Sequence, residues 1–257
     1  MKPVSWYKSL SQSKYRREHG YFLIEGKRAV DQLLAFHIDS IEELLCTEDT
    51  APFYIFPITA KSVPIRTISV PNMASICTSR TPQGIAALVR IPVDTYTSKI
   101  PEQPTLGGRI LLLEHVQDPG NVGTLIRTAA AFGIDGVILS GQCADPFSPK
   151  AVQSTAGSVL SVWIRKSDEY LSMVSGLKNR NYKLLAADLA GSESHDFNNT
   201  GPHILALGSE GAGLSDELLN ECDYRIRIPI VESGAESLNV AASGAICMFI
   251  LSRHFRP

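Results

Sequence analysis

The chain has 257 residues, of which 44% are hydrophobic and 19% charged, and its net charge is −2. This composition is ordinary for a globular protein with one large or two smaller domains, and it excludes a globally basic coat protein for nucleic acid. No apolar run reaches 18 residues and the first residues lack the apolar stretch of a signal peptide, so we expect a cytoplasmic protein without a membrane span.

Five cysteines are spread along the chain at positions 46, 77, 143, 222 and 247, with no C-x-x-C pair and no nearby histidine partner. This spacing is typical of reduced thiols rather than of a disulfide framework or a zinc site. We therefore expect no metal site.

The first 28 residues are basic, with seven Lys or Arg side chains against Glu18 and Glu25. Basic segments attract the phosphates of nucleic acid because binding releases condensed counterions. A solvated N-terminus without a partner is the alternative, and the charge alone does not decide between the two. The cations of interest are Lys14, Arg16, Arg17, Lys27 and Arg28.

Residues 1–91 are predicted to form a small α/β unit, because short apolar runs alternate with turn residues and one stretch of helical spacing. The expected elements are a strand over Tyr21–Ile24, a helix over Lys27–Ala35 and apolar runs at Ile41–Leu45, Tyr54–Ile58 and Ile85–Val89. Residues 92–108 hold three prolines and end on two glycines, which is typical of a linker between domains.

Residues 109–257 alternate apolar strands with helices, which predicts an α/β domain whose mostly parallel sheet is covered on both faces. Strands are expected at Ile110–Leu113, Val137–Leu139, Val162–Ile164, Lys183–Ala187, Ile204–Leu207 and Arg225–Ile228. Helices are expected at Asn121–Phe132 with Gly133 as its stop, around Ser148–Ala156, at Asp168–Leu177, after a Ser215 cap, and from about Ser237 to Arg253.

The first polar stretch is Asp118–Ala129, with the sequence Asp-Pro-Gly-Asn-Val-Gly-Thr-Leu-Ile-Arg-Thr-Ala. Asn121 is suited to cap the following helix. Arg127 follows Gly123 by four residues, so small side chains line its helical face and leave room for a guanidinium to meet a phosphate. An ordinary surface arginine on a capped helix is the alternative.

The second stretch, Leu207–Ser215, is a glycine-rich loop after an apolar run. It lacks the lysine of a P-loop and the G-x-G-x-x-G pattern, so nucleoside triphosphate or NAD binding is poorly supported. The backbone around Gly208 and Gly213 can instead hold another small ligand. Glu210 is either a site residue or a stabiliser of the next helix N-terminus.

The third stretch, Ile228–Val240, combines Pro229 at a strand end with Ser237-Leu238-Asn239 at a helix start. Serine and asparagine are preferred N-cap residues, and a capped terminus also presents polar groups to a ligand. Both roles can therefore hold together.

Two further features carry less weight. His115 is more often a loop residue than an acid–base group in such a place. The run Asp145–Lys150 resembles a stretch that recurs in related proteins, and this resemblance implies a loop facing a substrate, although Asp145 before a proline is also a common turn former.

In this order the three stretches resemble the three motifs of the SpoU (TrmH-like) family of RNA ribose 2′-O-methyltransferases. Residues 14–26 and Thr81–Gly84 are similar to the ribosomal-protein-L30e-like domain that binds substrate in many members. One departure is that the loop from Pro229 to Ser237 is one residue longer than the family pattern, with Gly234 later in it.

The resemblance implies a SPOUT fold for residues 109–257, with a C-terminal trefoil knot that general topology rules would not favour. It implies S-adenosylmethionine as methyl donor and cofactor. By the same resemblance, the catalytic set is Asn121, Arg127, Glu210, Ser237 and Asn239, and the cofactor-binding set is Leu207, Gly208, Gly213, Ile228 and Leu238.

The resemblance further implies a homodimer and an RNA partner, bound through residues 1–91. Large-subunit (23S-type) ribosomal RNA is preferred over tRNA, because the tRNA branch of the family typically carries terminal extensions in place of an L30e-like domain. The alternatives are a tRNA 2′-O-methyltransferase and a non-catalytic RNA-binding or ribosome-assembly protein of the same fold. A dinucleotide-dependent oxidoreductase is poorly supported, because the chain lacks the phosphate-binding fingerprint of that class.

Overall fold

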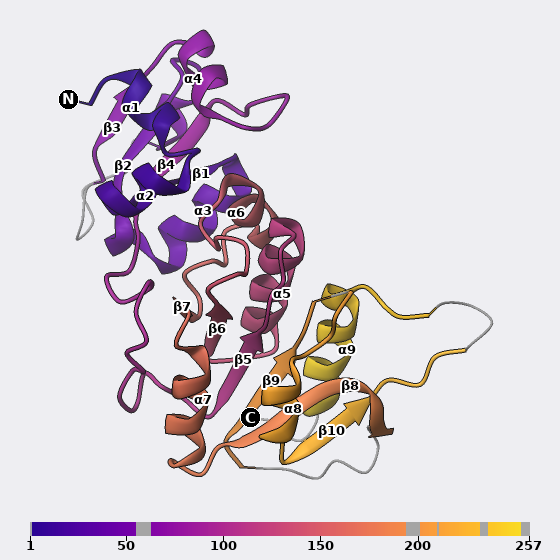
Figure 1. Cartoon of the computed structure of the whole chain (residues 1–257). Helices are drawn as coiled ribbons and strands as arrows, with labels where there is room; N and C mark the ends of the chain where they lie inside the picture. Colours follow the sequence, from indigo (N-terminus) through magenta and orange to yellow (C-terminus); the bar gives the residue numbers. More distant parts are fainter. Residues whose placement is uncertain (1, 55–62, 194–200, 210, 232–235, 253–257) are drawn as a thin grey trace. The chain divides into compact units, whose positions relative to one another are not determined.

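A computed structural model describes residues 2–54, 63–193, 201–209, 211–231 and 236–252 (Figure 1). The chain divides into two compact units. The first holds residues 1–93 together with residues 145–160, and the second holds residues 94–144 and 161–257. Residues 145–160 thus belong to the first unit. The division of the chain into 1–91, 92–108 and 109–257, expected from the sequence, did not include this segment in the first unit.

The first unit contains a four-stranded sheet in the order β1-β4-β2-β3, in which β4 is antiparallel to both neighbours and β2 and β3 are parallel. Its strands are β1 (Tyr21–Glu25), β2 (Ile41–Cys46), β3 (Ile65–Thr67) and β4 (Ile85–Arg90). Its helices are α1 (Val4–Ser9), α2 (Ser13–His19), α3 (Lys27–Phe36), α4 (Val70–Ile76) and α6 (Pro149–Thr155), with 3-10 turns η1 (Ile38–Ser40) and η2 (Ala51–Tyr54).

The expected strands and helix of this unit are confirmed, except for the apolar run at 54–58, whose residues 55–58 lie outside the described residues. The helices α1 and α2 are not in the sequence-based prediction, which treated their residues as a basic segment. Both are short, and α2 ends at Gly20, whose φ of +74° is the left-handed cap that glycine adopts without strain.

Residues 145–160 complete the core of the first unit. The ring of Phe147 lies 4.6 Å from the ring of Phe22, and both side chains are buried. Asp145 accepts a hydrogen bond from the backbone N of Phe147, as a turn former does, and also pairs with Arg16 at 2.6 Å. The sequence-based expectation of a substrate-facing loop therefore does not fit Phe147, which points into the core.

The structure places Arg16, one of the predicted RNA-binding residues, in the interior of the first unit. Its side chain is only 3% exposed, and its guanidinium is held by Asp145 and by the carbonyls of Leu10 and Ser11 at 2.8 and 2.9 Å. A guanidinium with these partners is part of the core of the unit and is not free to meet a phosphate. The neighbouring Arg17 is exposed.

The second unit contains a six-stranded sheet in the order β10-β8-β9-β5-β6-β7, with every pair parallel. Its strands are β5 (Arg109–Leu113), β6 (Gly136–Ser140), β7 (Trp163–Ser167), β8 (Lys183–Glu193), β9 (His203–Leu207) and β10 (Tyr224–Arg227). Its helices are α5 (Pro119–Ala131), α7 (Tyr170–Lys178), α8 (Asp216–Asn220) and α9 (Val240–Ser252). The predicted α/β class with a parallel sheet is confirmed.

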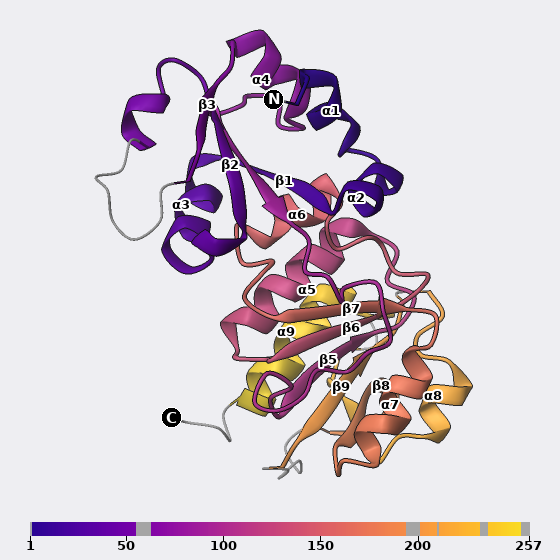
Figure 2. The same cartoon turned by 90° about the vertical axis from the view of Figure 1, so that its left-hand side faces the viewer.

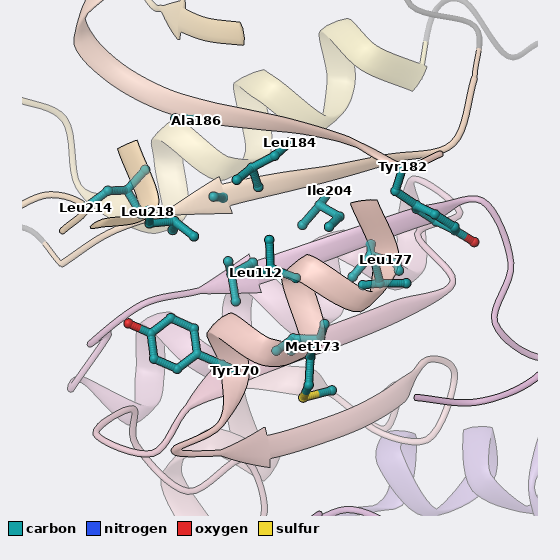
Figure 3. Close-up of a cluster of buried hydrophobic side chains, with 14 of the residues drawn as sticks. Leu112, Tyr170, Met173, Leu177, Tyr182, Leu184, Ala186, Ile204, Leu214 and Leu218 are labelled. Atoms are coloured by element: carbon teal, nitrogen blue, oxygen red, sulfur yellow. The ribbon is translucent and has the colours of Figure 1, made fainter. Parts of the chain in front are cut away.

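Helices cover both faces of this sheet (Figure 2). On one face, side chains from α7 and α8 meet alternate residues of the strands in a buried cluster (Figure 3). The cluster includes Leu112, Tyr170, Leu184, Ile204 and Leu218. Because both faces are covered, the central strands are continuous apolar runs, which is why the sequence identified them.

On the other face, α5 and α9 pack together against β9 at Gly244. A Cβ at this position would lie 2.3 Å from Leu125 of α5 and 2.7 Å from Leu207 of β9. The missing side chain therefore lets α9 approach both elements closely. Within the described ranges, no helix combines the length and the apolar character that crossing a membrane requires.

Three helices begin at residues other than those expected, and one of them is α7, which begins at Tyr170 instead of Asp168. α5 begins at Pro119 because Asp118, and not Asn121, is its N-cap, with the Asp118 carboxylate accepting from the Asn121 backbone N at 3.0 Å. α9 begins at Val240 and not at Ser237, because Asn239 caps it through the backbone N of Ala241.

We predict that Arg16→Gln lowers the free energy of unfolding by about 3 kcal/mol, because it leaves the Asp145 carboxylate, whose side chain is 11% exposed, without the guanidinium that pairs with it at 2.6 Å. Arg17→Gln is the matched control on the exposed side of α2, and its effect should stay within about 0.5 kcal/mol. Urea unfolding followed by circular dichroism measures both. Equal effects of the two substitutions would contradict the buried pair.

The ion pair between Arg16 and Asp145 also makes the stability of the fold depend on pH. Burial raises the pKa of Asp145, but Arg16 and hydrogen bonds from Phe147 and Ser13 outweigh it and hold the pKa below its ordinary value of 3.8. A depressed folded-state pKa stabilises the fold fully above the unfolded pKa, and this contribution is lost as the pH falls through the folded-state pKa. The difference between wild type and Asp145→Asn should therefore be constant near neutral pH and shrink below about pH 3.8.

Candidate functional site

A cavity of about 340 Å³ lies beside the middle of β8, at the carboxyl ends of β9 and β10 and at the start of α9. This is a size typical of small-molecule sites, and carboxyl edges of parallel strands are where ligands bind in such folds. All five residues of the expected cofactor set line it, namely Leu207, Gly208, Gly213, Ile228 and Leu238. Ser237 of the expected catalytic set lines it as well.

The glycine-rich loop forms one wall of this cavity. Ser209 and Gly213 exchange two backbone hydrogen bonds, with N to O distances of 3.1 and 2.9 Å. A Cβ on Gly208 would lie 2.1 Å from the carbonyl group of Gly213, so only glycine fits there. Gly213 has a φ of +68°, in the left-handed region. Glu210 of the expected catalytic set lies outside the described residues.

A buried carboxylate fixes the far end of the same loop. Glu114 follows β5 and is fully buried. Its carboxylate accepts from the backbone N and the hydroxyl of Ser215, both at 2.7 Å, and from the hydroxyl of Tyr170 at 2.5 Å. Burial, together with the Glu114 carboxylate, raises the pKa of Tyr170, so this phenol stays a donor.

The same contacts link Glu114 to the strands and to α8. Its backbone N donates to the carbonyl of Leu207 at 2.9 Å. Ser215 is at the same time the N-cap of α8, as the sequence predicted, and accepts from the backbone N of Leu218. Sequence reasoning missed Glu114, and an acidic residue directly after the apolar run Ile110–Leu113 was the available signal.

Asp188 is a second lining residue that the sequence did not single out. It follows the apolar part of β8, its side chain is 20% exposed, and its carboxylate lies 3.4 Å from the guanidinium of Arg225. Most of the remaining lining is apolar, with Leu214, Leu219 and Ile226 among its residues. The cavity thus offers apolar walls with a few polar groups, among them one carboxylate.

The first and third motifs meet beside this cavity. The side-chain amide of Asn239 donates to the side-chain oxygen of Asn121 at 3.2 Å. The Asn239 oxygen is occupied by the backbone N of Ala241 and of Ala242, at 2.9 and 3.3 Å, which fixes the orientation of the amide. Two residues 118 positions apart are therefore brought into contact.

Arg127 is placed differently from the other expected catalytic residues. It lies on α5 two turns beyond Asn121, is exposed, and is not part of the cavity lining. Within the described part of the chain, no carboxylate or carbonyl engages its guanidinium. It is thus available to an anionic ligand from solution.

The remaining basic residues of the prediction lie in the first unit. Lys14, Arg17, Lys27 and Arg28 are exposed on α2 and α3, whereas Arg16 is buried as described above. The structure therefore leaves four of the five expected cations accessible.

Comparisons with protein families match both parts of the chain. Residues 108–249 match the SpoU rRNA methylase family, and residues 4–87 match the MRM3-like substrate-binding domain.

Among named relatives, the 23S rRNA (guanosine(2553)-2′-O)-methyltransferase RlmP of Bacillus subtilis is 31% identical over 249 residues, covering 96% of this chain and 95% of its own length. The 23S rRNA (uridine(2479)-2′-O)-methyltransferase of Streptomyces viridochromogenes is 33% identical over 177 residues, covering 65% of this chain and 59% of its own length.

Solved structures are similar over nearly the whole chain. A TrmH-family protein from Porphyromonas gingivalis has a TM-score of 0.84 at 32% identity, covering 99% of this chain and 100% of its own. An rRNA methyltransferase from Sinorhizobium meliloti, solved with bound AdoMet, has a TM-score of 0.80 at 29% identity, covering 99% and 95%.

We predict that Glu114→Gln lowers the free energy of unfolding by about 2 kcal/mol, because an amide has one acceptor oxygen for three buried donors. Hydrogen exchange should also accelerate at the backbone amides of Gly208–Ser215. Glu169→Gln is the control, since Glu169 is exposed and its carboxylate accepts from the hydroxyl of Ser98 in an exposed hydrogen bond. Unchanged exchange in the loop of the Glu114 variant would contradict the role of this carboxylate.

Proposed function

The chain belongs to the SpoU rRNA methylase family and is an RNA methyltransferase that uses S-adenosylmethionine, and we propose that it methylates a ribose 2′-hydroxyl of large-subunit ribosomal RNA. The observation that carries the proposal is the cavity at the carboxyl edge of the second unit. Residues from the second and third motifs, which are separated in sequence, line this one cavity.

The residues of the cavity fit the methyl donor. Leu214, Ile226 and Leu238 provide apolar surface for the adenine ring, and the backbone of the Gly208–Gly213 loop provides hydrogen-bonding groups without side chains in the way. The carboxylate of Asp188 favours the positive charge of a sulfonium group. When bound, the donor supplies a methyl group on this positively charged sulfur.

The chain's own residues then position the acceptor. Methyl transfer from sulfur to the ribose 2′-oxygen requires the oxygen, the methyl carbon and the sulfur to lie in line. It also requires the hydroxyl proton to leave. Positioning alone supplies much of the acceleration. We assign Ser237, Asn121 and Asn239 to the polar side of the site, with the Asn121–Asn239 contact holding the start of α9 against α5. Glu210 belongs to the same proposed set.

Arg127 is assigned to the RNA side of the site. A guanidinium is a poor base because its pKa exceeds about 12, so Arg127 is not the group that removes the proton. It is exposed and lacks an acidic partner within the described residues, and so can bind a phosphate in bidentate fashion. We propose that an RNA phosphate organised by Arg127 accepts the 2′-hydroxyl proton.

The preference for large-subunit ribosomal RNA rests on the named relatives. Both act on 23S rRNA by name, and the Bacillus protein is similar over 95% of its length, including the first unit. The two relatives act on different nucleotides by name, so we assign neither nucleotide as the target of this chain. A tRNA substrate is the alternative. Mapping 2′-O-methyl groups in ribosomal and transfer RNA from cells with and without the gene tests the choice directly.

We assign RNA binding to the first unit, through the exposed cations Lys14, Arg17, Lys27 and Arg28. Support comes from the match of residues 4–87 to a substrate-binding domain. In functional terms we keep residues 1–91 as the RNA-binding domain, 92–108 as the linker and 109–257 as the methyltransferase domain. The C-terminal trefoil knot and the cytoplasmic location stay predictions.

We propose a homodimer formed over α9. This helix buries Gly244, Cys247 and Met248 against its own unit, yet its opposite side is apolar as well, with Ile246 37% exposed and Phe249 50% exposed. A helix that is apolar all round is normally covered all round. A second copy of the chain is the cover that the family resemblance favours.

Arg127→Ala should lower methyl transfer by about 100-fold or more, as removal of a charge-stabilising donor does in other active sites. Binding of S-adenosylmethionine should persist, because Arg127 does not line the cavity. Radiolabel transfer to RNA and calorimetry measure the two effects. Arg180→Ala, which removes an exposed arginine paired with Glu102, is the control, and near-normal turnover in the Arg127 variant would refute the assignment.

Phe249→Glu should shift the protein from dimer to monomer, because it places a charge in the proposed apolar interface. Light scattering at micromolar concentration measures the mass. Val93→Glu is the control, since Val93 is 97% exposed but lies outside α9. A monomeric mass for the wild type would overturn the proposed dimer.

A further inference from the structure

Four aromatic side chains of the first unit form a continuous row. Starting from β1 and passing over α1 to α2, the row is Tyr21, Trp6, His19 and Tyr15. Successive ring centroids are 6.0, 5.1 and 6.1 Å apart. The plane of the His19 ring is tilted by 31° to that of Trp6 and by 19° to that of Tyr15, so neighbouring planes here are closer to parallel than to perpendicular.

Two of the four rings are anchored in the core of the unit, and all four remain accessible in part. Trp6 and Tyr21 pack against the core cluster that contains Tyr7, Leu10 and Leu45. All four rings are nevertheless partly exposed. A ring fixed on its inner side loses little conformational freedom when a flat ligand stacks on its outer side, which favours binding.

Lysine side chains lie at the two ends of the row. Lys2 Nζ lies 3.9 Å from the Trp6 ring centroid and 4.1 Å from that of Tyr21, while Lys14 Nζ lies 5.8 Å from that of Tyr15. Within the described residues, neither lysine is paired with a carboxylate. Their charges are therefore available to phosphates flanking a base that stacks between them.

Aromatic faces combined with unpaired cations are the features that bind single-stranded nucleic acid, because each base offers a flat face and each linkage a negative charge. A duplex hides its base faces and would meet only the lysines. We propose that the row Tyr21-Trp6-His19-Tyr15 is a stacking platform for unpaired bases of the RNA substrate. The proposal rests on the proposed function for the identity of the ligand as RNA.

The chain allows a direct spectroscopic test, because Trp6 and Trp163 are its two tryptophans. Trp163→Phe, in the second unit, leaves Trp6 as the reporter. A single-stranded oligouridine should quench Trp6 fluorescence saturably, because a stacked base contacts the indole. A perfectly paired RNA duplex of equal length should quench it far less. No quenching, or equal quenching by both RNAs, overturns the platform.

Substitutions then test the individual rings. In the Trp163→Phe background, Tyr15→Ala and His19→Ala should each weaken oligouridine binding about tenfold, the effect of losing one stacked base. Tyr15→Phe keeps the ring and should restore binding. Phe53→Ala is the matched control, since Phe53 is 76% exposed beside Lys27 but lies outside the row. Equal effects of Tyr15→Ala and Phe53→Ala, in variants with unchanged thermal melting, contradict the proposal.

Failure of this inference and failure of the proposed function give different results. A protein that methylates RNA but shows unchanged oligouridine affinity in Tyr15→Ala lacks the platform and keeps the function. A protein whose Trp6 is quenched by single strands but that transfers no methyl group keeps the platform and lacks the function. S-adenosylmethionine binding should be unaffected by Tyr15→Ala and by His19→Ala.

Discussion

The hydrogen bonds to the Glu114 carboxylate determine where the walls of the cavity stand. A buried negative charge is tolerated only when donors surround it, and Ser215 and Tyr170 supply three. These donors come from the start of α8 and from α7, while the backbone of Glu114 is paired with Leu207. One residue after β5 thereby sets both ends of the glycine-rich loop. The close contact of Gly208 with Gly213 then leaves the loop little freedom to change its path.

Local patterns explain why much of the second unit could be predicted. Parallel strands covered on both faces must be apolar throughout, and Ser215 before a helix is a local N-cap signal. The members of the cofactor set lie in one cavity for the same reason, since each is at or next to the end of a strand or within three residues of a helix start. Helix starts were predicted less well, as Pro119 and Val240 show. Several neighbouring polar residues could cap each helix, and the sequence alone did not identify which one does.

Contacts over long sequence separations could not be predicted. Glu114 meets Ser215 across 101 residues, and Arg16 meets Asp145 across 129. Arg16 and Arg17 are indistinguishable as neighbours in a basic stretch, and only the direction of α2 turns one into the core and leaves the other exposed. The aromatic row escaped notice for a related reason, since its members come from three elements whose packing the sequence does not state.

The passage of residues 145–160 through the first unit has a consequence for biosynthesis. Phe22 and Arg16 acquire Phe147 and Asp145 as partners only after the chain has been made through β5, α5 and β6. At translation rates of about 5–20 residues per second, the nascent N-terminal segment waits on the order of several seconds for its last core element. The first unit thus cannot finish folding as an independent leading domain, and its completion is timed by synthesis of the following one.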